Sequence, residues 1–154
     1  MGKKNLYTKK HLFIILSVIF NVSLLVFIFS RSLTPAELSA EESGTVMDLI
    51  NSIFPLELSD HAVRKLAHFT EFCALGIITT LTVHSFCKRP FNGIFAKLFL
   101  CLAAAVTDEA LQINTVGRSA EVNDVILDFF GSFIGILLTT LIILLIRIRY
   151  KKVE

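Results

Sequence analysis

The sequence has 154 residues, no tryptophan, three prolines and few charged side chains, which make up 18% of the chain. Soluble domains average about 25% charged residues, so the low charge argues against an ordinary soluble domain. The three cysteines are an odd number and form no CxxC pair, which argues against a disulfide framework or a thiolate metal site. The net charge of +2, without basic residues alternating with aromatics, argues against nucleic acid as a partner.

The chain is instead rich in apolar residues, at 54% hydrophobic with a mean hydropathy of +0.71. A membrane-spanning helix needs roughly 20 mostly apolar residues. Four stretches of about this length predict an all-α fold, an integral membrane bundle of four transmembrane helices. The spans lie at about 12–30, 66–86, 94–113 and 124–146. The linkers are too short for a second folded unit, so residues 1–154 are expected to form a single membrane domain, with the first span as an uncleaved anchor.

The basic residues predict the orientation of this bundle. They gather at the N-terminus, after the second span at Lys88 and Arg89, and in the C-terminal tail. With four spans these three places share one side, which the positive-inside rule makes the cytoplasm. Every acidic residue except Glu154 falls on the other side or in the outer parts of the spans. We expect a multi-pass protein with both termini in the cytoplasm.

The outer connection between the first two spans has a helical pattern of its own. Residues 34–37, Thr-Pro-Ala-Glu, have the order of a capped helix start. Apolar residues then recur at helical spacing before Pro55, at Val46, Leu49, Ile50, Ile53 and Phe54. This pattern predicts a short amphipathic helix on the outer membrane surface, which either covers the bundle or contacts a ligand.

Polar residues that a spanning helix should avoid form a cluster in the outer part of the bundle. Arg64, His68 and Glu71 share one face of the second span at i, i+4, i+7 spacing. The third span contributes Asp108 and Gln112, one turn apart, with Glu109 beside them. The loop that follows contributes Arg118. The fourth span begins with two acids one turn apart, Asp124 and Asp128. Buried charge costs several kcal/mol in a membrane, and this local conflict predicts an outward-facing polar pocket.

The register of the fourth span supports an inward position for its two acids. The stripe that contains Asp124 and Asp128 continues as Gly131 and Gly135, a GxxxG pattern. Such a pattern allows a second helix to approach closely, so the aspartates are expected to point into the bundle and not at lipid.

Three chemistries fit this pocket, and the residues alone do not choose among them. A divalent cation could be held by His68, Asp108, Asp124 and Asp128. Arg64, Lys65 and Arg118 could bind a phosphate or carboxylate, with Glu109 and Gln112 beside them. His68, Glu71 and Asp108 are the candidates for acid–base catalysis, with Glu71 paired with His68 to orient its ring. No GxSxG, HExxH or Walker loop occurs, so whether the protein is an enzyme stays open.

Three ordered segments resemble the signatures of the VanZ-like family. They are residues 64–72, Arg-Lys-Leu-Ala-His-Phe-Thr-Glu-Phe; residues 108–112, Asp-Glu-Ala-Leu-Gln, followed by Val-Gly-Arg-Ser at 116–119; and residues 124–131, Asp-Val-Ile-Leu-Asp-Phe-Phe-Gly. Phe72 replaces a commoner tyrosine and Asp128 a frequent asparagine. The resemblance covers about residues 60–140.

The resemblance implies a bacterial membrane protein of the cell envelope, in a family named after a protein associated with resistance to the glycopeptide teicoplanin. We therefore expect a pocket that binds or modifies a lipid-linked envelope precursor or an anionic lipid and affects glycopeptide susceptibility. The alternative is a non-catalytic scaffold in which the buried charges hold the helices together and the outer loop recruits a partner. The lipid bilayer is a partner in either case, and the oligomeric state stays open.

Overall fold

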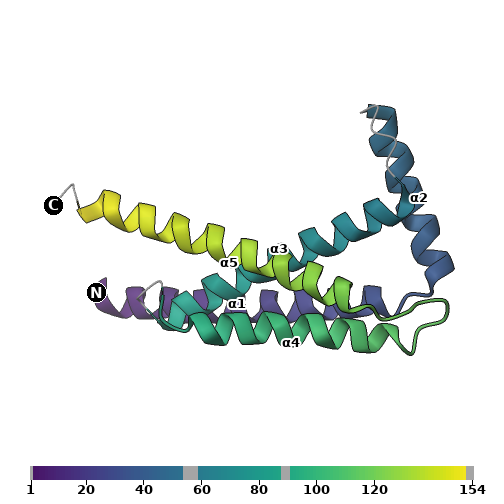
Figure 1. Cartoon of the computed structure of the whole chain (residues 1–154). Helices are drawn as coiled ribbons and strands as arrows, with labels where there is room; N and C mark the ends of the chain where they lie inside the picture. Colours follow the sequence, from purple (N-terminus) through teal and green to yellow (C-terminus); the bar gives the residue numbers. More distant parts are fainter. Residues whose placement is uncertain (1, 54–58, 88–90, 152–154) are drawn as a thin grey trace.

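The computed structural model describes residues 2–53, 59–87 and 91–151. It has five helices, α1 Gly2–Ser32, α2 Ala36–Ile53, α3 Asp60–Phe86, α4 Ile94–Gln112 and α5 Val122–Lys151. No strand occurs in these three segments, which confirms the all-α prediction. α1, α3, α4 and α5 run side by side, and both chain ends lie at the same end of this bundle (Figure 1). The predicted basic residues Lys88 and Arg89, and the predicted helix stop at Pro55, lie outside the described residues.

Three of these helices are long and apolar enough to cross a membrane. The qualifying segments are His11–Ser32, Asp60–Phe86 and Val122–Tyr150. The predicted third span, now α4, is not among them, and it contains Lys97, Asp108 and Glu109. α1, α3 and α5 extend beyond the predicted spans, because a charged residue ends an apolar run without ending a helix.

The interior of the bundle is built mainly where α3 packs against its neighbours. α3 has its most extensive contact with α5 and its next with α1. Phe72 and Leu75 of α3 join Ile28 of α1, Ala105 of α4 and Ile136 of α5 in one buried cluster. Most of the large apolar side chains of α1 and α5 instead point away from the bundle and are exposed. Such a distribution is expected when lipid, and not water, surrounds a helix bundle.

Glycines bring the backbones of α3 and α5 into direct contact. A Cβ at Gly131 would lie 2.6 Å from the carbonyl oxygen of Phe69, and one at Gly135 would lie 2.1 Å from that of Cys73. From the α3 side, a Cβ at Gly76 would lie 2.1 Å from the carbonyl oxygen of Ser132. These distances confirm the close helix approach that the GxxxG pattern predicts.

α2 lies apart from the bundle, at the end opposite the chain termini, and runs across the direction of the other helices (Figure 1). Ser43 of α2 donates a side-chain hydrogen bond to Asp60 at the start of α3. Thr34, the predicted cap of this helix, instead donates to the carbonyl oxygen of Ser30 in α1. Apolar residues Leu49 and Ile53 of α2 are exposed, at 61% and 64%.

The glycine contact generates a matched pair of stability predictions. We expect Gly135→Ala to destabilise the protein by roughly 1–3 kcal/mol, because the new methyl group forces the two backbones apart. We expect Gly44→Ala to stabilise it by roughly 0.5–1 kcal/mol, since this helical glycine has nothing within 4 Å of its Cβ direction. Thermal unfolding of purified protein in detergent measures both, and equal effects of the two substitutions would contradict the packing described here.

Candidate functional site

The predicted polar residues meet at the end of the bundle away from the chain termini. The first turns of α3, the last turn of α4 and the first turns of α5 all lie toward that end (Figure 1). The hydroxyl of Ser59 caps α3 by accepting a hydrogen bond from the backbone N–H of Ala62, at 3.2 Å. α3 therefore begins just before the helical face that contains Arg64 and His68.

These elements enclose a cavity of about 100 Å³. Its walls come from α3, the end of α4, the following loop and the start of α5. A water molecule needs about 10–15 Å³ of such space, so the cavity has room for several waters or for an anionic group such as phosphate or carboxylate. The charged or polar lining residues are His61, Arg64, Lys65, His68, Glu109, Gln112, Arg118, Ser119, Glu121, Asp124 and Asp128.

Asp108 is fully buried beside this cavity and is held by three side chains. Ser32, at the end of α1, donates a hydrogen bond to Oδ1. Gln112 donates to Oδ2 at 3.2 Å and to Glu109 Oε1 at 2.9 Å. Nδ1 of His68 lies 3.8 Å from Asp108 Oδ2. Asp108 thus joins α1, α3 and α4 through one carboxylate.

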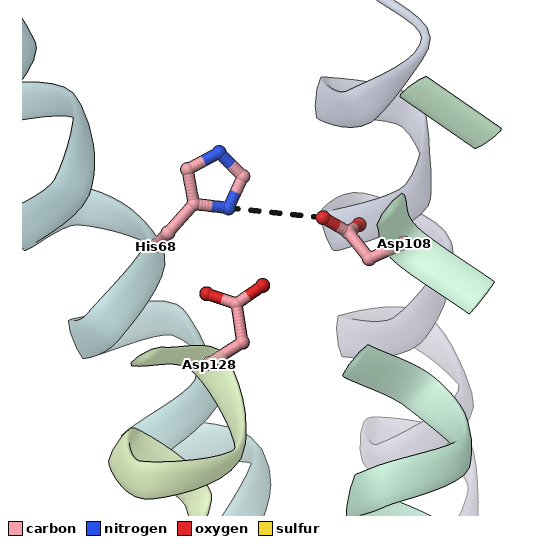
Figure 2. Close-up of side chains that lie close together, drawn as sticks. All are labelled: His68, Asp108 and Asp128. Atoms are coloured by element: carbon pink, nitrogen blue, oxygen red, sulfur yellow. Dashed lines mark ion pairs between the residues drawn. The ribbon is translucent and has the colours of Figure 1, made fainter. Parts of the chain in front are cut away.

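Asp128 has the opposite character. It is 1% exposed, and neither carboxylate oxygen has a hydrogen-bond partner among the described residues. Figure 2 shows its carboxylate between α3 and α4, facing the same space as His68 and Asp108. One ligand atom from each of these three residues lies within 4.8 Å of the others. This is the group in the described chain that could hold a metal ion.

The cationic side chains of the site differ in whether they form an ion pair. Lys65 of α3 forms an ion pair with Asp124 of α5 at 2.9 Å, with both side chains about one-third exposed. In the part of the chain that the structure describes, Arg64 and Arg118 form no such direct pair. The Nε of Arg118 also has no hydrogen-bond partner there, and burial lowers the pKa of its guanidinium. An anion in the cavity would therefore stabilise this poorly solvated charge.

The loop that contains Arg118 is tied to the end of α1. Thr115 donates a hydrogen bond to the carbonyl oxygen of Ser32 at 3.1 Å, and Ala36 N donates to the carbonyl oxygen of Val116 at 3.1 Å. Gly117 follows in the left-handed region, with φ of 75°, which only glycine adopts without strain. This turn directs Arg118 to the cavity.

Most predicted site residues lie around this cavity, but the predicted pairing of His68 with Glu71 is not found in the described ion pairs. Asp108 is the carboxylate beside the His68 ring, because the ring faces α4 and not its own helix. Glu71 lines a second cavity, of about 120 Å³, which His68, Arg64 and Arg118 also line. Asp124 pairs with Lys65 and is outside the group of possible metal ligands.

Three groups that form hydrogen bonds in or beside the site were not predicted from the sequence. They are Ser32, Thr115 and the backbone N–H of Glu121, which donates to Glu109 Oε2 at 2.9 Å. Ser32 ends an apolar helix and has no periodic relation to the charged residues, so no pattern could have singled it out. The loop contacts involve backbone atoms, which residue types do not report.

An all-helical chain with three apolar helices of spanning length and a buried polar cluster at one end is a membrane protein. The family model described as VanZ/LLP1 matches residues 14–145, and the chain belongs to this family. The match confirms the resemblance noted for residues 60–140 and extends it to α1 and α2. No curated protein matches the chain. No solved structure matches it either.

The contrast between the two buried aspartates gives a stability prediction. The measurement uses protein treated with a chelator, so that no metal ion contributes to stability. We expect Asp108→Asn to lower the free energy of unfolding by about 1–3 kcal/mol, because an amide keeps only one oxygen for the donors Ser32 and Gln112. We expect Asp128→Asn to raise the unfolding midpoint, since no donor loses an acceptor and a neutral amide costs less to bury than a carboxylate. Thermal unfolding in detergent measures both variants. A loss of stability in Asp128→Asn equal to that in Asp108→Asn would contradict the unpaired state of Asp128.

Proposed function

We propose that the protein crosses a bacterial cytoplasmic membrane four times, with both termini in the cytoplasm and the cavity facing outward. The span added to the three apolar helices is α4, whose charged residues face the bundle. Lys97, Asp108 and Glu109 are all at most 4% exposed. The opposite face consists of exposed apolar residues at helical spacing, Phe95, Phe99, Leu102 and Val106. A helix with its charges buried and an apolar outer face can lie against lipid in spite of its low average hydropathy.

In this arrangement α2 lies at the outer membrane surface. Its direction across the bundle is that of a helix parallel to the membrane plane (Figure 1). Its exposed apolar residues Val46, Leu49 and Ile53 would enter the headgroup region, as in other interfacial helices.

The function that these features support best is the binding of an anionic group of a lipid-linked envelope precursor or anionic lipid, with an effect on glycopeptide susceptibility, here teicoplanin. One observation carries this proposal: Arg64 and Arg118 line the cavity without a direct ion pair to a carboxylate among the described residues. Arginine presents a planar fork of donors that matches phosphate and carboxylate oxygens. The anionic group would occupy the cavity between these side chains, and the rest of a lipid would lie outside it.

A scaffold is the second candidate, and other contacts favour it. Lys65–Asp124 and Ser32–Asp108 each join two different helices. Under this hypothesis the polar residues stabilise the bundle, α2 recruits a protein partner, and removal of a charge lowers the amount of folded protein before it lowers activity.

The topology generates its own prediction. We expect a fluorescent reporter that folds only in the cytoplasm to be bright when fused after Glu154, and dark when inserted after Ser119 in the loop between α4 and α5. The expected result follows from an even number of spans with α4 among them. A bright loop insertion would place the cavity on the cytoplasmic side and refute the outward orientation.

The anion-binding proposal is tested with Arg64→Gln and Arg118→Gln, and with Arg149→Gln as the matched control at the far end of α5. We expect each cavity variant to bind a polyprenyl phosphate about 10- to 100-fold more weakly, because a hydrogen bond to a charged group contributes roughly 1.5–3 kcal/mol. Native mass spectrometry in detergent measures binding, with zwitterionic phosphatidylcholine as the comparison lipid.

The same variants are expressed in a deletion strain, with teicoplanin susceptibility measured beside the amount of monodisperse protein. Lost protection at an unchanged protein amount supports the binding function. Protection that falls only in step with the protein amount supports the scaffold. A wild-type protein that binds both lipids equally, or that gives no protection, contradicts the corresponding part of the proposal.

A further inference from the structure

We propose that His68, Asp108 and Asp128 bind a divalent metal ion of the zinc and manganese class between α3, α4 and α5. The three side chains come from three different helices and converge on one space, as Figure 2 shows. One ligand atom of each lies within 4.8 Å of the others. The residues were candidates from their chemistry alone, and the fold selects these three and leaves Asp124 with Lys65.

The unpaired state of Asp128 is the independent observation that points to a ligand. Its carboxylate is 99% removed from solvent, and both oxygens lack a hydrogen-bond partner among the described residues. Nδ1 of His68, which faces the same space, lacks one as well. A buried carboxylate requires a cation, a proton or donors. No lysine or arginine forms a direct ion pair with Asp128 in the described chain.

The spacing also argues against a hydrogen bond between the ring and Asp108. Nδ1 of His68 and Oδ2 of Asp108 are 3.8 Å apart, which is beyond hydrogen-bond range. Two ligands of a tetrahedral ion with bonds of about 2.1 Å lie about 3.4 Å apart. A metal ion between the two atoms therefore needs them to close by a few tenths of an ångström. The network of Ser32 and Gln112 holds Asp108 with Oδ2 on the side of the ring. Such hydrogen bonds orient the ligands of metal sites in proteins.

The donor set indicates which ions fit. One imidazole nitrogen and two carboxylates suit zinc and manganese. Calcium takes six to eight oxygen ligands, more than this group offers, and no cysteine belongs to it. The two carboxylates balance the charge of a divalent ion, which makes the buried group neutral with His68 uncharged.

Three protein ligands leave a coordination position free, as in catalytic zinc sites. His68 and Asp128 also line the cavity that contains Arg64 and Arg118, so this position is open to an anion there. The bound ion would add its charge to those of the two arginines and contact a phosphate oxygen directly. This last step rests on the proposed function, whereas the binding of the ion does not.

The test uses purified full-length protein that has been stripped with a chelator and dialysed. Competition with a zinc indicator measures Zn²⁺ affinity, and the visible spectrum of added Co²⁺ reports the ligand set. We expect one equivalent of tightly bound Zn²⁺ and a stabilisation of the wild type against heat. Asp128→Asn and His68→Ala should each weaken binding at least about 100-fold, since even loss of a group that only orients a ligand costs about 10–100-fold.

The matched control is Asp124→Asn, which removes a cavity carboxylate outside the three-residue group, one turn earlier on α5, and should weaken Zn²⁺ binding far less than Asp128→Asn does. Wild-type protein that does not bind the ion overturns the proposal, as does an equal loss in Asp124→Asn and Asp128→Asn. Because Asp128→Asn is expected to be at least as stable as wild type in chelator, its loss of Zn²⁺ binding cannot be ascribed to misfolding.

Binding of a polyprenyl phosphate is then compared with and without Zn²⁺. Tighter binding with the ion supports its role in the cavity. Zn²⁺ binding at the three residues without any lipid binding leaves the metal site standing and contradicts the proposed function. Lipid binding that is unaffected by Zn²⁺ supports the proposed function and overturns the role of the ion in it.

Discussion

The backbone contact between α3 and α5 is the constraint on which the rest of the structure depends. Gly131 and Gly135 allow the two helices to touch, and Asp128 lies on the same stripe of α5, one turn before the first of them. The contact therefore places a buried carboxylate against the face of α3 that contains His68. A larger residue at either glycine would widen the bundle and hydrate the carboxylate. The close packing and the buried charge are thus consequences of the same short sequence.

Helical periodicity predicted the helices, the faces that carry Arg64 and His68, and the inward position of Asp128. It could not predict partners across helices, because spacing places a residue on a face but does not give the rotation of that face relative to its neighbours. Spacing alone therefore predicts Glu71, on the same helix, as the partner of His68, whereas the structure places Asp108 beside the His68 ring. Average hydropathy likewise hides that the charges of α4 all face inward. Ser32 and the loop contacts depend on tertiary structure alone and were not predictable.

Some charged side chains of the site have a hydrogen-bond or ion-pair partner and others have none among the described residues. The first kind is explained by stabilisation of the bundle, and the second kind calls for a functional explanation. Asp108 has its donors, and Lys65 has Asp124, so these groups are explained by helix–helix stabilisation. Asp128 and Arg118 contribute no such contact and are still buried or half-buried. A bundle selected only for stability would replace them with apolar residues of similar size. Their presence is the physical reason to seek a ligand at this end of the protein.

The hydrogen bond between Ala36 and Val116 has a mechanical consequence. Ala36 is the first residue of α2, and Val116 stands two residues before Arg118. The start of α2 is therefore connected directly to the loop at the cavity. In the membrane arrangement proposed above, a change in bilayer surface pressure or curvature that tilts α2 would pull on this loop through the hydrogen bond between Ala36 and Val116. That arrangement would couple the occupancy of the cavity to the state of the surrounding membrane.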